Sequence, residues 1–185
     1  MITIKNASQI AKMREAGALL HEVLEQLKGK IEPGITTKEL DRYAEKLIRG
    51  YGAVPSFLNY EGYPASICAS VDSQVVHGIP GGYKLKDGDI ISVDVGAILN
   101  GYHGDAARTI LIGNVKDEVK QLVEVTRECF FRGMEQAVAG NHIADIGAAV
   151  EQCAHDHGYG VVRELVGHGI GTSMHEPPEV PNFVD

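Results

Sequence analysis

The stretch DIISVDVGAILNGYHGDAARTILIG, residues 89–113, decides the fold that this sequence predicts. Two runs rich in β-branched residues flank Asn100-Gly101, and Asn-Gly between such runs is the strongest short-range signal of a β-hairpin. With these two residues in the turn, Leu99 lies opposite Tyr102. The stretch therefore predicts a long antiparallel hairpin whose alternate residues face a core.

Two aspartates fall on one face of this hairpin. In the predicted register Asp94 lies opposite Ala107, and Asp105 lies opposite Gly96. The two aspartates are then diagonal neighbours, and their backbones are roughly 7–8 Å apart. Their direct partners are small, which leaves room between them. His103 shares this face in the same register.

The paired aspartates admit two interpretations. Two like charges on a half-buried face are costly unless something neutralises them, and bridged divalent cations would do so. Alternatively, both aspartates lie at a solvent-exposed strand edge near the turn. A single β-bulge would also move one side chain to the other face. The geometry favours the metal site.

Hydrophobic spacing and turn residues predict the other elements. Asn6 or Ser8 caps the first helix, and Thr36 with Glu39 forms a capping box for the second. The histidine-bearing stretch HEPPEV, residues 175–180, is expected to be irregular. The expected helices are 8–28, 36–50, 117–139 and 143–157, and the further expected strands are 65–71, 74–80 and 161–165.

The sequence also contains an internal repeat. Residues 33–52 align without gaps on residues 139–158, and this alignment places Glu45 on Glu151. We therefore expect one domain, residues 1–185, built from a first repeat of about 8–113 and a partial second repeat of about 117–185. The copy of the hairpin would begin beyond Asp185, so we expect the second half to be incomplete.

Composition excludes several classes of protein. The 185 residues carry a formal net charge of −8 and are 44% hydrophobic, as in ordinary globular domains. The acidic balance, without a basic run, argues against nucleic-acid binding. No apolar stretch could span a membrane, and no signal peptide is evident. The three cysteines lack CxxC spacing, which indicates free thiols in the cytoplasm.

Three histidines are candidates for a site with the aspartates. His168 sits between glycines after an expected strand, His175 begins an irregular Pro-rich stretch, and His77 follows another strand. Oxygen-rich sites with one imidazole suit Mn, Fe, Co or Zn. No serine-hydrolase, P-loop or HExxH motif is present. Cys68 with His77 could form a thiol hydrolase, but Cys68 has the apolar neighbours of a core residue.

Several motifs together resemble the type I, bacterial-type methionine aminopeptidases over the whole chain. They are KMREAG, NYEGYPASIC, VVHGIP, LKDGDIISVDVGAILNGYHGDAART, VGHGIG and MHEPPEVPN. HGIG followed by HEPP favours type I over type II and over prolidase or creatinase relatives. The resemblance implies the pita-bread fold, an internally duplicated α/β (α+β) architecture with helices on the outer face of an antiparallel sheet.

The resemblance also implies a role for each matched residue. Asp94 would chelate one metal ion, Asp105 would bridge two, and His168 would ligate the other. The ions would be two divalent metals from among Co, Mn, Fe, Zn and Ni. His77 and His175 would hydrogen-bond the substrate and its tetrahedral intermediate. The residues expected to line the methionine pocket are Phe57, Tyr60, Tyr63, Cys68 and Met174.

The implied activity is removal of the N-terminal methionine from nascent proteins at the ribosome, by a monomer when full-length. The family's two further glutamates, one of them the general base, would fall beyond Asp185. We therefore expect the 185-residue chain to be inactive alone. Two alternatives stay open: a catalytically inert peptide- or protein-binding module of the same fold, and a truncated product without function.

Overall fold

The computed structural model describes residues 1–184, which divide into two compact units. The sheet unit comprises residues 4–115 and 170–174. The helical unit comprises residues 1–3 and 116–169 and the described residues from His175 onward. Within residues 1–184, no helix has the length and apolar character needed to cross a bilayer.

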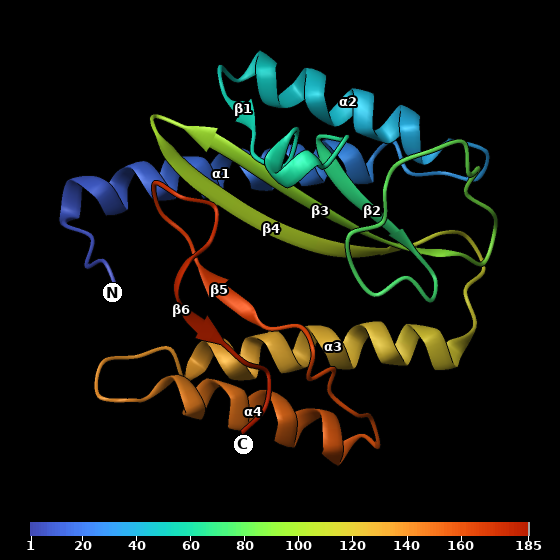
Figure 1. Ribbon diagram of the computed structural model, residues 1–185. Helices are drawn as coiled ribbons and strands as arrows, with labels where there is room; N and C mark the ends of the chain where they lie inside the picture. The colour runs from blue at the N-terminus through green and yellow to red at the C-terminus, as the bar shows by residue number, and fades with distance from the viewer. Residues whose placement is uncertain (185) are drawn as a thin grey trace. The chain divides into compact units, whose positions relative to one another are not determined.

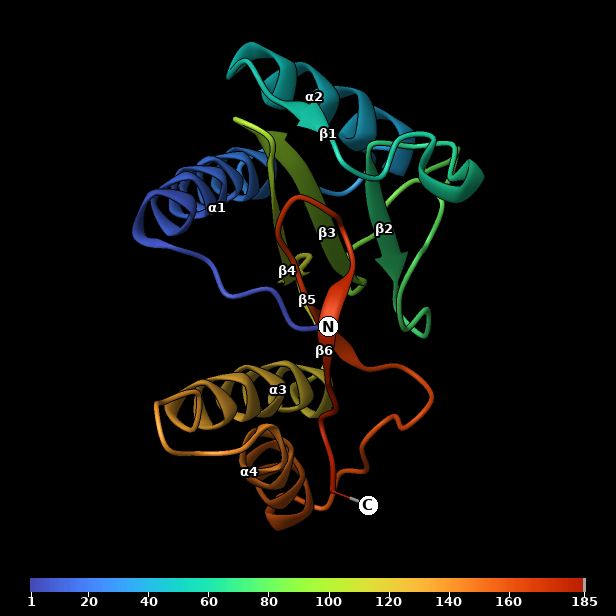
Figure 2. The same cartoon turned by 60° about the vertical axis from the view of Figure 1, so that its left-hand side comes forward.

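The sheet unit has four antiparallel strands with its two α-helices on one face (Figures 1 and 2). Strand β3 is central and pairs with β1, β2 and β4. The strands are β1 (Val54–Pro55), β2 (Ile67–Val71), β3 (Ile90–Leu99) and β4 (Tyr102–Leu111), and the helices are α1 (Ala7–Lys28), α2 (Thr37–Gly50) and the 3₁₀ turn η1 (Tyr60–Gly62).

The predicted hairpin is confirmed residue by residue. Leu99 pairs with Tyr102, as the Asn-Gly turn requires. Asn100 and Gly101 have φ values of 53° and 81°, both left-handed, which is the backbone of a type I′ turn. This turn fixes the register of β3 and β4 along their whole length, because the pair runs without a bulge.

The helix caps are also as predicted, with Asn6 rather than Ser8 at the start of α1. The Asn6 side chain accepts a hydrogen bond from the Gln9 N–H at 3.0 Å. At α2, Thr36 Oγ1 accepts from the Glu39 N–H, and Glu39 accepts in return from the Thr36 N–H. Such caps satisfy amide groups that a helix start otherwise leaves without partners.

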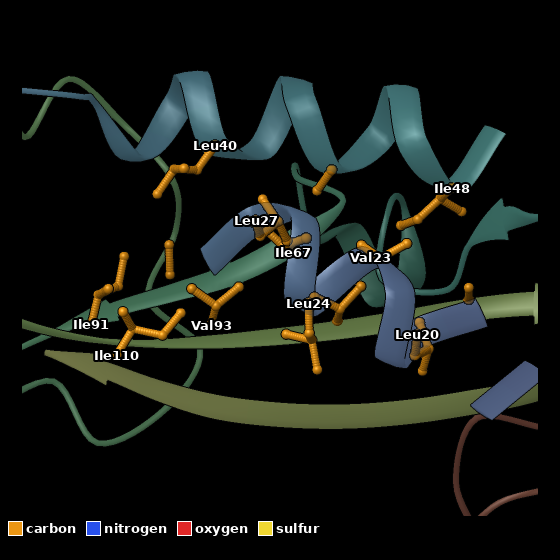
Figure 3. Packing of buried hydrophobic residues seen from close by; sticks show 14 of the residues in the cluster. Leu20, Val23, Leu24, Leu27, Leu40, Ile48, Ile67, Ile91, Val93 and Ile110 are labelled. Carbon is orange, nitrogen blue, oxygen red and sulfur yellow. The ribbon is translucent and has the colours of Figure 1, made fainter. Parts of the chain in front are cut away.

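One hydrophobic core joins α1 and α2 to the sheet (Figure 3). The odd-numbered residues of β2 and β3 supply its sheet side, as period-2 alternation demands. Burial of each aliphatic side chain contributes about 1.5–3 kcal/mol. The labelled contributors are Leu20, Val23, Leu24 and Leu27 of α1, Leu40 and Ile48 of α2, and Ile67, Ile91, Val93 and Ile110 of the strands.

The helical unit pairs two helices and carries a small sheet. Helices α3 (Asp117–Glu135) and α4 (Ile143–Asp156) share buried side chains that include Cys129 and Cys153. Strands β5 (Gly167–Gly169) and β6 (Glu176–Val180) pair antiparallel, with an irregularity between His168 and Gly169.

Four local predictions were wrong. Residues 74–80 form no strand, because Val75 and Val76 are exposed and no neighbouring strand pairs with them. Residues 161–165 form none either, and the strand begins later at β5. The predicted helix 117–139 ends at Glu135. The stretch expected to be irregular contains β6, since two-strand pairing tolerates proline on an edge.

Two helical glycines predict opposite stability effects. A Cβ at Gly147 of α4 would lie 2.4 Å from the Phe183 carbonyl oxygen, whereas a Cβ at Gly17 of α1 would meet nothing within 4 Å. Gly147→Ala should therefore lower the free energy of unfolding by about 1–3 kcal/mol. Gly17→Ala should raise it by about 0.5–1 kcal/mol. Urea unfolding followed by circular dichroism measures both, and equal effects would contradict the packing difference.

Candidate metal centre

The sheet face opposite the hydrophobic core carries polar side chains. Across it, Cys68 of β2 pairs with Asp94 of β3, which pairs with Ala107 of β4. One row further, the Ser92 and Thr109 hydroxyls hydrogen-bond at 2.8 Å. The alternation that sends odd-numbered residues of β3 into the core therefore sends Asp94 to the other face.

Asp94 and Asp105 are brought together as predicted. Asp105 pairs with Gly96, two residues along β3 from Asp94, and the two carboxyl groups interact directly. Burial, the negative charge of Asp105 and a hydrogen bond that protonated Asp94 donates to it raise the pKa of Asp94 from 3.8 to about 8. The metal-free pair therefore holds a proton at neutral pH in place of a second negative charge.

This pair fits a divalent cation. Asp94 Oδ1 is buried and has no hydrogen-bond partner among the described residues. A buried carboxylate oxygen without a donor is costly, and a bound cation would remove that cost while displacing the shared proton. Carboxylate oxygens are ligands that hard divalent ions accept. The donor set of the sheet unit therefore suits a metal ion at Asp94 and Asp105.

A compact apolar cluster adjoins the aspartates. Phe57, Cys68 and Met174 are buried together, and Tyr60 and Tyr63 pack against them. All five pocket residues expected from the sequence are thus gathered in the sheet unit. Cys68 stands directly opposite Asp94 in the sheet, so the cluster begins beside the carboxylate pair.

Gly96 gives this cluster the space that it occupies. A Cβ at Gly96 would lie 2.5 Å from Phe57 Cε1 and 2.9 Å from Ser56 Cβ. Any larger residue at position 96 would push the Phe57 ring out of the cluster. The small residue opposite Asp105 thus serves the apolar cluster as well as the carboxylate pair.

His103 holds the segment that carries Met174. Its backbone N–H donates to the Gly171 carbonyl at 2.8 Å. Its buried ring is joined through Nδ1 to Ser56 Oγ by a 2.9 Å hydrogen bond. Sequence reasoning placed His103 on the aspartate face but missed Ser56, because nothing in the local pattern distinguishes that serine.

The three candidate histidines fall in both units. His77 lies in the sheet unit with a left-handed backbone, φ 58°. In the helical unit the rings of His168 and His175 are 4.2 Å apart between centroids and tilted by 49°. His168 Nδ1 donates to the Gly169 carbonyl at 3.0 Å, so Nε2 carries the lone pair that could bind a metal.

The complete predicted ligand set stays a prediction. Asp94 and Asp105 belong to the sheet unit and His168 to the helical unit. Within residues 1–184, no cluster of three or more His, Cys, Asp or Glu side chains is gathered closely enough to hold a metal ion.

Cys68 is unsuited to the thiol-hydrolase alternative. It is 5% exposed, and burial raises the pKa of its thiol to about 11. Since the thiolate is the reactive form, we expect Cys68 in the folded protein to react with iodoacetamide at pH 8 at least about tenfold more slowly than in urea. Mass spectrometry of the alkylated Cys68 peptide measures this ratio, and equal rates would contradict the buried environment.

Comparison with known proteins identifies the family of this chain. The sequence model of metallopeptidase family M24 matches residues 11–185. The chain belongs to the M24 metallopeptidases, a class of hydrolases that use divalent metal ions. Methionine aminopeptidase from Clostridium perfringens is 53% identical over 183 residues, 99% of this chain and 74% of the relative. Methionine aminopeptidase 1 of Bacillus subtilis is 48% identical over the same shares.

Solved structures give the same result. The crystal structure of methionine aminopeptidase from Rickettsia prowazekii matches with a TM-score of 0.97 and 39% identity, over 99% of this chain and 74% of that one. A Xaa-Pro dipeptidase from Bacillus anthracis matches with a TM-score of 0.83 and 27% identity, over 97% and 49%. The predicted family and the pita-bread α/β fold are therefore confirmed.

Proposed function

We propose that this protein removes the N-terminal methionine from other proteins, the activity for which its relatives are named. One observation carries the proposal. The paired carboxyl groups of Asp94 and Asp105, with a buried oxygen that lacks a donor, adjoin an apolar cluster beginning at Cys68. A cation site beside an apolar pocket suits an exopeptidase for an apolar first residue.

Asp94, Asp105 and His168 are the proposed metal ligands. Asp105 would be shared between two divalent ions chosen from Co, Mn, Fe, Zn and Ni. When bound, such ions supply a water-derived nucleophile at neutral pH and polarise a peptide carbonyl. The protein contributes the positions of the ligands, because Asp94 and Asp105 stand on a rigid hairpin.

The remaining residues would bind and orient the peptide. The cluster of Phe57, Cys68 and Met174, with the rings of Tyr60 and Tyr63, would exclude water from the methionine side chain. His77 and His175 would donate hydrogen bonds to the scissile amide and to the negative oxygen that develops on it. These roles follow the family resemblance and agree with the chemistry of each side chain.

The proposed substrates are nascent chains emerging from the ribosome in the cytoplasm, acted on by a monomer. The net charge of −8 fits a protein that does not bind nucleic acid directly. We also propose that residues 1–185 form one duplicated catalytic domain. In support, the glycines before α2 and α4, Gly34 and Gly140, share a φ of 99° at positions that the repeat aligns.

The test is methionine release from the tripeptide Met-Ala-Ser by the protein purified at the length that its own cells make. We expect release that requires Mn²⁺ or Co²⁺ and that Asp94→Asn abolishes. A Xaa-Pro dipeptide serves as the competing substrate. Cleavage of that dipeptide in preference, or peptide binding without release, would contradict the proposal.

A further inference from the structure

Gly78, which follows His77, is held by two hydrogen bonds to strand β2 and by a third to Tyr63. The Ala69 N–H donates to the Gly78 carbonyl at 2.8 Å, and the Gly78 N–H donates to Ser70 Oγ at 3.0 Å. The Tyr63 hydroxyl donates to the same Gly78 carbonyl at 3.1 Å. The backbone at position 78 is thereby held from both its amide and its carbonyl.

The approach is close enough to require glycine. A Cβ at Gly78 would lie 2.5 Å from the Ala69 carbonyl oxygen and 2.8 Å from the Ser70 Cα. Both atoms belong to the backbone of a paired strand, so neither can move easily. The segment after β2 therefore touches that strand at one defined point.

The backbone conformation of His77 requires contacts that hold it in place. Its φ of 58° lies in the left-handed region, which non-glycine residues seldom adopt unless their surroundings impose it. The neighbouring apolar side chains do not impose it, because Val75 and Ile79 are 60% and 62% exposed. The hydrogen bonds at Gly78 are thus the contacts that hold the backbone beside His77.

Two of these bonds come from side chains with little freedom. Ser70 is 3% exposed and lies on the polar face of the sheet, opposite Ser92. Tyr63 packs its ring against the cluster of Phe57, Cys68 and Met174, and its one hydroxyl proton is shared between the Gly78 and Ile67 carbonyls, each at 3.1 Å. Tyr63 therefore connects the apolar cluster directly to the backbone beside His77.

We propose that Ser70 and the Tyr63 hydroxyl are positioning residues for His77, fixing its backbone so that its ring meets the substrate in one orientation. The inference rests on the proposed function for the importance of His77, whereas the positioning itself rests on the contacts of Ser70 and Tyr63. Because Tyr63 also packs on the cluster, filling of the methionine pocket and placement of His77 are coupled through one side chain.

Ser70→Ala tests the positioning without reference to activity. The variant removes the acceptor of the Gly78 N–H, and Ser92→Ala is its matched control, since it removes a hydroxyl from the same sheet face. We expect hydrogen exchange at the Gly78 amide to accelerate at least about tenfold in Ser70→Ala alone. The Cα chemical shift of His77, which reports φ, should move, while the Val93 and Val95 amides keep their exchange rates.

The consequence for catalysis is measured on the protein at the length that its cells make. Ser70→Ala should lower kcat for Met-Ala-Ser about tenfold and leave KM within about twofold, because His77 acts on developing charge. Tyr63→Phe keeps the ring in the cluster and should shift kcat in the same direction. If Ser70→Ala fails to fold, Tyr63→Phe is measured in its place.

Each outcome has one meaning. Unchanged exchange at Gly78 in Ser70→Ala, together with an unchanged His77 shift in Ser70→Ala and in Tyr63→Phe, would overturn the positioning inference. Faster exchange at Gly78 with unaltered kcat would overturn the link between His77 and catalysis. Absence of methionine release by the wild-type protein would overturn the proposed function alone, because the exchange result stands by itself.

Discussion

Asp94→Asn is expected to weaken Mn²⁺ binding at least about 100-fold. The substitution keeps the shape of the side chain but removes its negative charge and one of two ligand oxygens. Asp94 Oδ1 is buried without a donor, and the remaining carboxylate, Asp105, would have to hold the ion with half of the pair's charge. Loss of even an outer-shell partner costs about 10–100-fold in metal affinity, and loss of a ligand should exceed that.

Isothermal titration with Mn²⁺, repeated with Co²⁺, measures the effect. Asp87→Asn is the control, since it removes the same charge from the same unit at an exposed carboxylate that accepts from the Asn114 N–H at 2.9 Å. That variant should bind metal as the wild-type protein does. Equal affinities for Asp94→Asn and Asp87→Asn would eliminate the carboxylate pair as the metal site.

The metal-free protein is expected to lose stability as the pH rises from about 4 to about 8. Burial and the neighbouring Asp105 raise the pKa of Asp94 from 3.8 to about 8 in the folded state. The folded state therefore binds a proton that the unfolded chain has released. The stabilising contribution is fully present below pH 3.8, falls throughout this window and is lost above pH 8. The loss is on the order of a few kcal/mol.

Urea unfolding in the presence of a chelator at pH 5, 7 and 9 measures this loss. The difference between wild-type protein and Asp94→Asn isolates it from the other carboxylates, because asparagine stays neutral throughout. Saturating Mn²⁺ should reverse the trend, since the metal replaces the proton. Parallel pH profiles for the two proteins would show that Asp94 ionises normally in the fold.

The sheet unit could be predicted well because its signals are local. Asn100-Gly101 determines the turn, and the turn determines which residues of β3 and β4 face each other. The errors occurred where pairing depends on distant residues. Val75 and Val76 have strand-forming side chains but no strand beside them, whereas β6 forms around prolines because β5 is available to pair.

In the candidate site, too, contacts set by local sequence could be predicted and contacts between distant residues could not. The proximity of Asp94 to Asp105 follows from the register alone, so the sequence was enough to predict it. Ser56 beside His103 and the Ser70 contact with Gly78 join residues that are far apart or separated by a turn. Alternation along β2 could have placed Ser70 on the face of Cys68, but only the folded backbone brings Gly78 to it.

The Asn-Gly turn of the hairpin has a consequence for how this gene tolerates change. Because the turn anchors the register, a one-residue deletion between Asp94 and Asn100 would exchange the two faces of the part of β3 that precedes it, since side chains alternate with a period of two. Asp94 would enter the hydrophobic core, and a valine would take its place beside Asp105. Reading-frame-preserving indels in this strand should therefore be far rarer than substitutions, since one lost codon removes the site and the core together.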